Sequence, residues 1–332
     1  MYELYLTNPE EMILKKMEPL SQPQRDDVKV KITYGGICGS DLRVFDGKVP
    51  YATYPVRPGH ELIGTVTETG PDSNFSVGDR VVVLPNTFCD ECDMCLKGYR
   101  NICRHKKSLG INLDGGFAQE FMISSKFLLS IPDEITDEKA VLIEPLAVIV
   151  HAFKKVKLNK NSRVAIIGCG NEGLLATLYA SHMGAEVTVI DINPRKKELA
   201  KQINEDVTFL YPQDITTEKF DVVIESAGVR SAVEQAFKLV NPGGSLVIIG
   251  LAKEANIPVV DIVRNEINVF GSVIYHFPED YLDTIKLLSD PGFEAEKVIS
   301  KIMHFKDYKK AYEYAKSGDY GKIILNFKEE IN

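Results

Sequence analysis

Four of the six cysteines lie within a stretch of fifteen residues, and their spacing suits a single metal ion. They stand in the run FCDECDMCLKGYRNIC and are Cys89, Cys92, Cys95 and Cys103. One loop with this spacing can present four thiolates to a tetrahedral Zn²⁺ and close the site to water. The first three cysteines are too crowded for an ordinary set of disulfides. The sequence therefore predicts a structural zinc site in this loop.

A fifth cysteine and a His-Glu pair come from two other segments and suit a second zinc site. Cys38 stands in GGICGSDL, and His60 and Glu61 follow in the run GHE. Cysteine, histidine and carboxylate ligands from separate segments are typical of a zinc ion that keeps one coordination position open. The sequence therefore predicts a catalytic zinc here, and two zinc ions per chain.

A glycine-rich run in the second half of the chain predicts a dinucleotide site. Residues 168–173 read GCGNEG, follow the apolar run SRVAII and open a helix-like segment. In a G-x-G-x-x-G of this context, the first glycine permits a tight turn and the second admits the pyrophosphate. The third allows close packing of helix on strand. A turn that merely prefers glycines is the alternative interpretation.

Two acidic residues near this run bear on the cofactor. Asp191 ends the next apolar run, where a carboxylate can bind the ribose hydroxyls and repel a 2′-phosphate. NAD is thus favoured over NADP, unless Asp191 only caps its strand. Glu172 brings a negative charge to a loop that more often has an apolar residue at this position. We expect its side chain to point away from the pyrophosphate.

The elements that must position these residues change in character along the chain. Up to about residue 145, short β-like runs such as VKVKITYGG and ELIGTVTETG alternate with Gly, Pro and Asn, which indicates a partly open barrel or curled sheet. From about residue 160, apolar strands alternate with helices, as in a doubly wound parallel sheet. The turn NPGG is expected to separate one helix from its strand. After two polar helices, the closing strand GKIILNF is expected to return to the first domain.

Composition and charge narrow the class of protein. The 332 residues suit two domains, and 39 basic against 47 acidic residues give a net charge of −8 without a basic block. Nucleic acid and anionic membranes are therefore not expected as partners. The N-terminus has no apolar signal segment, and the run AVLIEPLAVIVHAF is too short to span a bilayer. We expect a cytoplasmic protein.

Motifs along nearly the whole chain resemble those of the zinc-containing medium-chain dehydrogenase/reductase family. In order they are CGSDL at 38–42, GHE at 59–61, the four-cysteine loop, DGGFA at 114–118, IEP at 143–145, the G-x-G-x-x-G and the closing strand. The runs CGSDL, GHE and LIEPLAV are most similar to the polyol branch, which includes sorbitol, butanediol and galactitol-phosphate dehydrogenases. The resemblance implies an α/β protein with a GroES-like β-barrel catalytic domain, residues 1–146 completed by 287–332. It also implies a Rossmann NAD-binding domain at 147–286, with the active site in the cleft between the domains.

The resemblance also implies roles for the site residues. Cys38, His60 and Glu61 become catalytic zinc ligands, and Glu144 becomes a fourth ligand or a carboxylate that alternates with water or substrate. A surface or N-cap carboxylate is the other interpretation of Glu144. Ser40 becomes the first proton relay, while Asp41 would orient His60 through the distal ring nitrogen. The cofactor residues implied are Gly168, Gly170, Asn171, Glu172, Gly173, Asp191, Ala227, Gly250, Ser272 and Val273.

Three residues are expected in the substrate pocket. His276 and Phe117 are implied as lining residues, although Phe117 could equally be core. Arg43 stands where the family usually has a histidine. Arginine stays protonated and cannot relay a proton, but its guanidinium suits a phosphate or carboxylate of the substrate. A solvated Arg43 beside Asp46 is the alternative.

The implied reaction is hydride transfer between NAD and a secondary alcohol of a polyol or sugar alcohol, free or phosphorylated. A threonine or simple-alcohol dehydrogenase is the alternative within the family. A zinc-binding regulatory protein that responds to NAD is the alternative from another class. The expected partners are a small alcohol substrate and further copies of the chain, in a homo-oligomeric dimer or tetramer.

Overall fold

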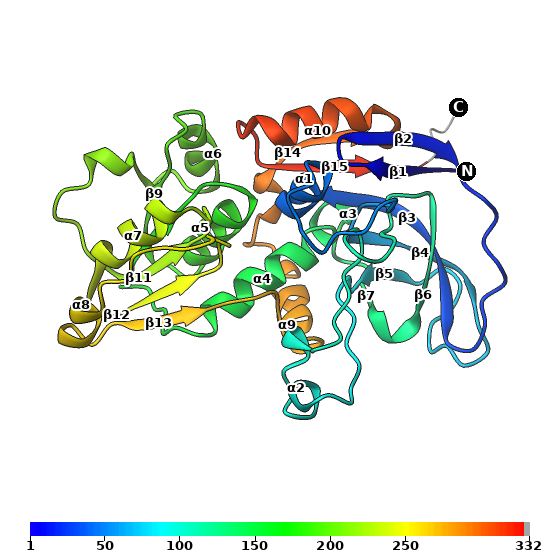
Figure 1. The fold of residues 1–332 in the computed structure, drawn as a ribbon, viewed down its shortest axis with the longest axis horizontal. Helices are drawn as coiled ribbons and strands as arrows, with labels where there is room; N and C mark the ends of the chain where they lie inside the picture. Colours follow the sequence, from blue (N-terminus) through cyan, green and yellow to red (C-terminus); the bar gives the residue numbers. More distant parts are fainter. Residues whose placement is uncertain (329–332) are drawn as a thin grey trace.

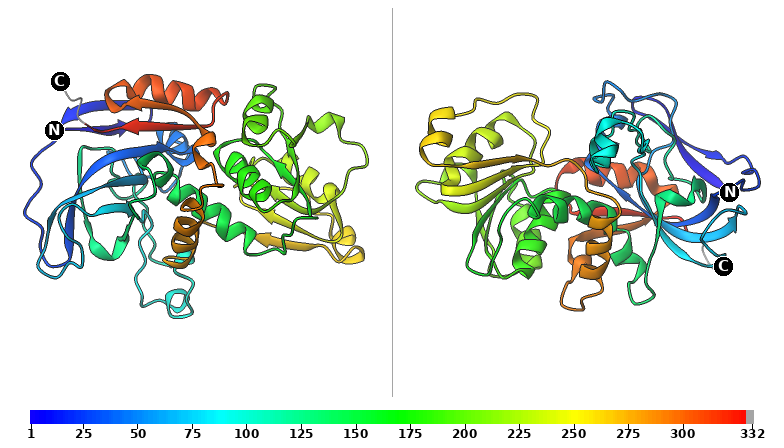
Figure 2. Two further views of the ribbon diagram at one scale, coloured as in Figure 1. Left: turned by 180° about the vertical axis from the view of Figure 1, so that it is seen from behind. Right: turned by 90° about the horizontal axis from the view of Figure 1, so that it is seen from below.

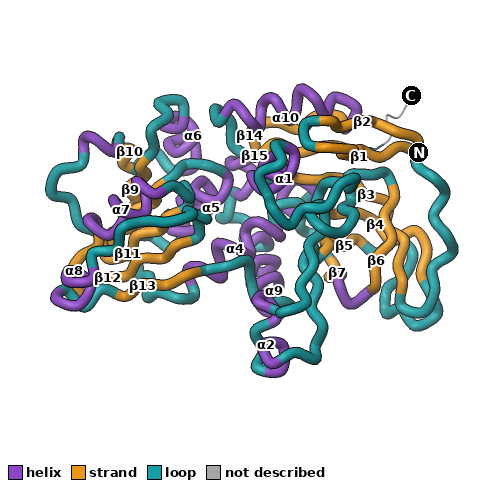
Figure 3. Tube along the Cα trace, viewed as in Figure 1, coloured by secondary structure: helices purple, strands orange, loops and turns teal. Residues whose placement is uncertain are grey.

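The structure is a computed structural model that describes residues 1–328. Two bodies lie side by side, one rich in strands and one in which helices and strands alternate (Figures 1 and 3). The strands of the first body are β1 (Tyr2–Asn8), β2 (Glu11–Lys16), β3 (Asp27–Ile37), β4 (Glu61–Thr69), β5 (Arg80–Val83), β6 (Glu120–Ser124), β7 (Leu128–Ser130), β14 (Ile299–His304) and β15 (Lys322–Asn326). Its helices are α1 (Gly39–Phe45), α2 (Asp93–Leu96), α3 (Asp137–Ala140) and α10 (Tyr308–Ser317).

The main sheet of this body has the order β14-β15-β3-β4-β5-β7, with β6 also paired to β3. One edge of β3 pairs with β4, while its first residues pair with β6 and its last residues pair with β15. The sheet thus curls around a core of alternating apolar side chains such as Val28, Val30 and Ile32. Because β15 lies beside the end of β3, the C-terminal strand borders the loop that carries Cys38. Residues 329–332 of the segment 287–332 lie outside the described residues.

The second body is built on a six-stranded parallel sheet. Its elements are β8 (Arg163–Ile167), α5 (Asn171–His182), β9 (Glu186–Ile190), α6 (Lys196–Ile203), β10 (Thr208–Leu210), β11 (Phe220–Glu225), α7 (Arg230–Leu239), β12 (Val240–Ile248), α8 (Val259–Arg264) and β13 (Asn268–Gly271). The strand order is β10-β9-β8-β11-β12-β13, so the chain reverses direction across the sheet between β8 and β11. This confirms the doubly wound topology that the alternating runs predict.

One local prediction is wrong. The run NPGG does not separate a helix from a strand, because β12 begins at Val240, before it. The pairing with β11 jumps from Phe220↔Val240 to Val222↔Ser245, so the run forms a bulge within the strand. Gly243 has a φ of 75°, a left-handed conformation that glycine adopts without strain.

Two helices lie between the bodies, α4 (Ile143–Phe153) and α9 (Glu279–Leu288) (Figure 2). Nearly every residue of α4 is buried, and its side chains belong to a core that also includes residues of β8 and α5. Short 3₁₀ helices cover Arg100–Ile102, Ser125–Phe127, Pro212–Asp214, Ala295–Val298 and Phe305–Asp307. Among the described residues, none of the helices has the length and apolar character needed to cross a membrane.

Candidate active site

The three predicted ligands of the catalytic zinc come together at the end of β3 and the start of β4. One ligand atom from each of Cys38, His60 and Glu61 can be chosen so that all three lie within 4.8 Å of one another. Strand pairing causes this, because Gly36 of β3 lies opposite Glu61 of β4. A Cβ on Gly36 would lie 1.9 Å from Oε2 of Glu61, so only glycine leaves room for that carboxylate. A thiolate, an imidazole and a carboxylate this close fit a zinc ion.

His60 is held by two neighbours from helix α1. Oδ1 of Asp41 lies 3.2 Å from Nδ1 of His60, and Oγ of Ser40 lies 3.3 Å from its Nε2. Burial alone would lower the pKa of His60, but the Asp41 carboxylate and the Cys38 thiol raise it well above its usual value. Asp41 also accepts the Cys38 N–H at 2.9 Å, so one carboxylate fixes two of the candidate ligands.

A buried lysine that sequence reasoning missed contacts Glu61. Nζ of Lys322 donates hydrogen bonds to both carboxylate oxygens of Glu61, at 2.6 and 2.7 Å. Both side chains are almost completely inaccessible to solvent. Burial opposes the charged form of Lys322, yet the negative charges of Glu61 and Cys38 hold its pKa above the usual value. A charged residue that opens the otherwise apolar strand KIILNF is the signal in the sequence that could have revealed this pair.

Glu144 is near the three-residue cluster, but it is not one of the residues whose ligand atoms lie within 4.8 Å of one another. It is buried near the start of α4, which excludes the surface interpretation, and Oε1 accepts a hydrogen bond of 2.8 Å from the Tyr275 hydroxyl. Burial raises the pKa of Glu144 to about 7, and the nearby Glu61 charge adds to this rise, whereas His60 and Tyr275 lower it. Tyr275 was missed by sequence reasoning, which singled out its neighbour His276.

Glu172 has no partner within the described part of the chain for one of its carboxylate oxygens. Oε2 is buried and makes no hydrogen bond. Burial raises the pKa of Glu172 to about 8, and Glu61 and Glu144 raise it further, while Lys322 opposes the shift. The Glu172 carboxyl therefore lies close enough to the charged groups of the candidate metal site to interact with them.

The four-cysteine loop, beside helix α2, brings together Cys89, Cys92, Cys95 and Cys103 as a second candidate metal site. Three contacts between the sulfur atoms measure 3.6, 3.9 and 4.0 Å. A zinc ion with bonds of about 2.3 Å to four sulfurs separates them by about 3.8 Å, so the donor set fits a closed site. Backbone N–H groups of residues 91 and 92 point at the Cys89 sulfur. Hydrogen bonds from the backbone of Cys95 and Arg104 lower the pKa of Cys92 to about 6, which favours the thiolate.

The residues expected to bind the cofactor lie at one edge of the parallel sheet. Five segments follow the carboxyl ends of neighbouring strands, and they carry Gly168 after β8, Asp191 after β9, Ala227 after β11, Gly250 after β12 and Ser272 after β13. Dinucleotides bind at this edge of open parallel sheets, at the point where the strand order reverses. Oγ of Ser272 is buried without a hydrogen-bond partner among the described residues, so it has an acceptor and a donor to offer there.

The glycine-rich loop has the shape that a pyrophosphate needs. Gly168 has a φ of 92°, and a Cβ on Gly173 would lie 1.8 Å from the Gly168 carbonyl oxygen. Around Gly170, by contrast, a Cβ would meet nothing within 4 Å, so the backbone is open at the start of α5. Asp191 supports the loop, since its carboxylate accepts N–H groups of Cys169 at 2.6 Å and Asn193 at 2.8 Å. Each carboxylate oxygen keeps a lone pair for a ribose hydroxyl.

Of the three residues expected to line the substrate pocket, Phe117 is instead part of the core. It is completely buried and packs on Gly59, where a Cβ would lie 2.0 Å from its ring. His276 is half-buried and its ring lies 4.7 Å from that of His151, while Val273 is exposed. Arg43 is exposed on α1. Asp46, its alternative partner, instead accepts from Lys48 at 2.8 Å and Lys316 at 2.7 Å.

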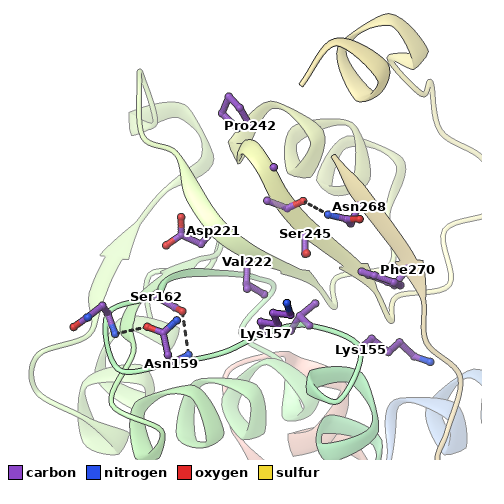
Figure 4. A pocket seen from close by; sticks show the side chains of 14 residues that line it. Lys155, Lys157, Asn159, Ser162, Asp221, Val222, Pro242, Ser245, Asn268 and Phe270 are labelled. Atoms are coloured by element: carbon purple, nitrogen blue, oxygen red, sulfur yellow. Dashed lines mark hydrogen bonds between the residues drawn. The ribbon is translucent and has the colours of Figure 1, made fainter. Parts of the chain in front are cut away.

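A cavity of about 770 Å³ lies at the opposite edge of the parallel sheet (Figure 4). Ser162, Asp221 and Asn268 line it, and these residues stand at the amino ends of β8, β11 and β13. It therefore lies away from both the glycine-rich loop and the candidate metal site, and we assign it no part in the chemistry.

Comparisons with known proteins agree with this geometry. Residues 24–133 match the family described as alcohol dehydrogenase GroES-like domain, and residues 173–290 match the family described as zinc-binding dehydrogenase. Sorbitol dehydrogenase from Halalkalibacterium halodurans is 31% identical over 329 residues, which cover 94% of each chain. Galactitol 1-phosphate 5-dehydrogenase from Escherichia coli K12 is 32% identical over 322 residues, 91% of this chain and 92% of that protein.

Solved structures similar to this chain are dehydrogenases as well. Galactitol-1-phosphate dehydrogenase from Escherichia coli has a TM-score of 0.90 and 28% identity, covering 98% of this chain and 100% of that one. A zinc-binding dehydrogenase from Sinorhizobium meliloti bound to NADP has a TM-score of 0.89 and 28% identity, covering 98% of both chains. An alcohol dehydrogenase from Escherichia coli CFT073 complexed with NADH has a TM-score of 0.89 and 25% identity, covering 98% of this chain and 99% of that one.

Proposed function

The chain belongs to the family of zinc-dependent medium-chain alcohol and polyol dehydrogenases, and we propose that it transfers hydride between NAD and a secondary alcohol group of a polyol. One contact carries the proposal: the Asn171 side chain, in the glycine-rich loop, donates to the carbonyl of Ile37 at 3.4 Å, one residue before Cys38. A dinucleotide bound at that loop and a substrate bound at the Cys38 site would be neighbours. A purely regulatory zinc protein gives no reason for an open metal site beside a cofactor loop.

Cys38, His60 and Glu61 would hold the catalytic zinc, and we propose Glu144 as the group that exchanges with water or substrate. Zinc bound there would supply Lewis-acid activation of an alcohol oxygen. Ser40 has its hydroxyl 3.3 Å from the imidazole, and we propose that it accepts the substrate hydroxyl proton as the first group of a relay. Asp41 keeps the imidazole in place, and Tyr275 holds Glu144 at the edge of the site.

We propose NAD as the cofactor in preference to NADP. The support is Asp191, whose carboxylate is fixed by two backbone N–H groups where the ribose would lie. A 2′-phosphate there would meet a negative charge that cannot move away. The family includes structures with either dinucleotide, so this residue is the feature that decides the preference.

The substrate class is a polyol, and a phosphorylated polyol is favoured by Arg43. Its guanidinium is exposed five residues after Cys38, and Asp46 is already bound by two lysines. The test is an assay of NAD reduction with free and phosphorylated forms of the same polyol, and with L-threonine. A preference for threonine or for simple alcohols would contradict the polyol assignment, and no NAD reduction with any alcohol would favour the regulatory alternative.

We also propose that the protein forms a homo-oligomer through the free edge of the parallel sheet. Val259, Val260 and Val263 of α8 are 60–70% exposed, and Val269 of the edge strand β13 is 40% exposed. An unpaired edge strand beside an apolar helix suits pairing with a second copy. All six cysteines are free thiols in the structure, which suits the reducing cytoplasm as the location.

The domain division remains a proposal as well. We propose residues 1–146 with 287–332 as the catalytic domain and 147–286 as the NAD-binding domain. The support is the pairing of β15 with β3, which places a C-terminal strand in the first sheet.

A further inference from the structure

Lys322 has more donors than it uses. An ammonium group carries three N–H donors, and within the described residues Lys322 donates two hydrogen bonds, one to each oxygen of Glu61. Its side chain is 1% exposed, so bulk solvent does not reach the ammonium group. A buried ammonium is stable only while carboxylates or other acceptors surround it.

Zinc binding would disturb this pair. Glu61 is one of the three candidate ligands. A carboxylate lone pair that now accepts a hydrogen bond from Lys322 would therefore bind the metal instead. Lys322 would then lose part of the one acceptor that it has among residues 1–328, while a divalent cation enters beside it. A second acceptor near Lys322 would relieve this competition.

The candidate for that acceptor is Glu172, from the other body of the protein. The start of α5 lies against the end of β3 and the start of β15. Asn171 donates to the Ile37 carbonyl, and the Leu174 side chain would lie 3.1 Å from a Cβ on Gly321. Gly321 precedes Lys322, and Ile37 is paired with Ile323. Glu172 stands between these two contacts, and its buried Oε2 has no hydrogen-bond partner in residues 1–328.

We propose that Glu172 is a positioning residue that receives Lys322 when Glu61 binds the metal. In the structure Lys322 is held by Glu61, and Oε2 of Glu172 has no hydrogen-bond partner among residues 1–328. In the zinc-loaded state Lys322 is shared with Glu172, so that the Glu61 carboxylate is released to the metal and the buried charges stay balanced. No bond other than hydrogen bonds and the zinc ligand bond changes. The inference rests on the zinc site of the proposed function, and it does not depend on the substrate.

The test measures how tightly the catalytic zinc is held, by competition with a chelator in the full-length protein. We expect Glu172→Gln to raise the dissociation constant of the catalytic zinc about tenfold, the size of one charge-assisted hydrogen bond. The zinc ion of the four-cysteine loop is an internal control, and the affinity of that loop for zinc should be the same in the variant and the wild type. Glu225→Gln is the matched control, because Glu225 is also a buried carboxylate with an unpartnered Oε2 in the NAD-binding body. Its zinc affinity should stay within twofold of the wild type.

A second variant separates this role from a general structural one. In a Lys322→Met background no ammonium competes for Glu61, so Glu172→Gln should change zinc affinity by less than twofold. A crystal structure of the zinc-loaded enzyme gives an independent reading, with Nζ of Lys322 expected within 3.5 Å of a Glu172 oxygen, the usual outer limit of a hydrogen bond. If Lys322→Met does not fold, this crystal structure tests the role of Glu172 by itself.

Three results would overturn the inference. They are a wild-type zinc affinity in Glu172→Gln, an undiminished Glu172→Gln effect in the Lys322→Met background, or a zinc-loaded structure in which Lys322 keeps both oxygens of Glu61 and avoids Glu172. Each leaves the proposed dehydrogenase function standing. A wild-type protein that binds no zinc at Cys38 would instead overturn both.

Discussion

The Tyr275 hydroxyl donates a hydrogen bond of 2.8 Å to Oε1 of Glu144, although the two residues are 131 positions apart in the chain. The direction of this bond is fixed by a further one, because Nδ2 of Asn86 donates to the Tyr275 oxygen at 3.1 Å. Asn86 in turn accepts from the Ser108 hydroxyl at 2.8 Å. A chain of donors that begins in the first body thus ends on a buried carboxylate at the edge of the metal site.

Tyr275→Phe should therefore weaken both stability and activity. The variant leaves a buried carboxylate without a donor, which costs about 1–3 kcal/mol of unfolding free energy. We expect kcat/KM to fall about tenfold, since Glu144 loses the bond that positions it and 1.4 kcal/mol corresponds to a factor of ten. Urea unfolding and steady-state assays measure the two effects. Tyr308→Phe is the matched control, because its buried hydroxyl donates to the Met12 carbonyl at 3.1 Å and takes no part in the network around Glu144. Equal effects of both substitutions would contradict the role of Tyr275.

The two metal sites should differ in how they lose zinc. We expect two zinc ions per chain, and mild chelation should remove the one held by Cys38, His60 and Glu61, because an open site exchanges ligands more readily than a closed one. Cys38→Ala should abolish turnover while the circular dichroism spectrum stays unchanged. Cys92→Ala should chiefly destabilise the four-cysteine loop. Elemental analysis that finds one zinc or none in freshly purified active protein would contradict this prediction.

Asp191→Ala should narrow the preference for NAD over NADP. It removes the negative charge that a 2′-phosphate would meet, so kcat/KM with NADP should rise relative to NAD. The same substitution frees the N–H groups of Cys169 and Asn193, so affinity for NAD should also fall. Fluorescence titration with NADH and NADPH measures both changes. Equal use of the two cofactors by the unmutated enzyme would refute the role of Asp191.

Asp280 should stabilise the loop that carries Tyr275, and this effect has a defined pH dependence. Burial would raise the pKa of Asp280, but hydrogen bonds from His151, Lys154 and the backbone of His276 lower it from 3.8 to about 2. A carboxyl whose folded pKa is depressed contributes stability above its unfolded pKa and loses it as pH falls through the folded pKa. Asp280→Asn should therefore lower the free energy of unfolding by about 1–2 kcal/mol, allowing for solvent screening, at every pH above about 5.

Below about pH 4 this difference between wild type and Asp280→Asn should shrink, because the carboxyl takes up a proton in the unfolded chain near its ordinary pKa of 3.8, while in the folded protein it stays ionised down to a pKa of about 2. Thermal unfolding at several pH values measures it. Asp283→Asn is the matched control, since Asp283 also pairs with Lys154 but is 54% exposed. It should cost less than about 0.5 kcal/mol. A loss for Asp280→Asn that grew toward acid pH would contradict the assignment.

The metal and cofactor sites could be predicted because their residues stand close together in the sequence and have few chemical uses. Cys89, Cys92 and Cys95 lie on one loop, and Gly168, Gly170 and Gly173 lie on one turn, so local spacing already contains the geometry. Alternation of strands and helices likewise predicts a parallel sheet, because the pattern is repeated several times.

Residues that meet only through the tertiary fold could not be placed in this way. Lys322 reaches Glu61 across 261 positions, because the last strand returns to pair with β3. Phe117 follows two glycines and looked like a pocket residue, but the left-handed Gly59 leaves a space that its ring fills from inside the core. The NPGG run has the composition of a turn, yet the sheet on both sides continues through it as a bulge. In each case packing decided between two local structures that the sequence allows.

Arg43 provides the last prediction, that the enzyme recognises an anionic group on its substrate. The residue is exposed on α1, in the segment that also supplies Cys38 and Ser40. Asp46, the first acidic residue after Arg43 in the sequence, is bound by Lys48 and Lys316, so the forked guanidinium is available for a phosphate. Arg43→Ala should raise KM for a phosphorylated polyol and leave kcat nearly unchanged, as expected when binding is lost equally in ground and transition states.

The expected loss for Arg43→Ala is about 1.5–3 kcal/mol in kcat/KM, the usual strength of a hydrogen bond to a charged group. Activity on the neutral form of the same polyol should barely change, because no anion is present to bind. Lys48→Ala is the matched control: Lys48 is an exposed cation, 67% accessible, on the same segment, but it pairs with Asp46. A substitution of Lys48 that raised KM as much as that of Arg43 would indicate a diffuse charge effect rather than a specific contact. An enzyme that prefers neutral polyols and tolerates Arg43→Ala would make Arg43 a surface charge, and the substrate a free polyol.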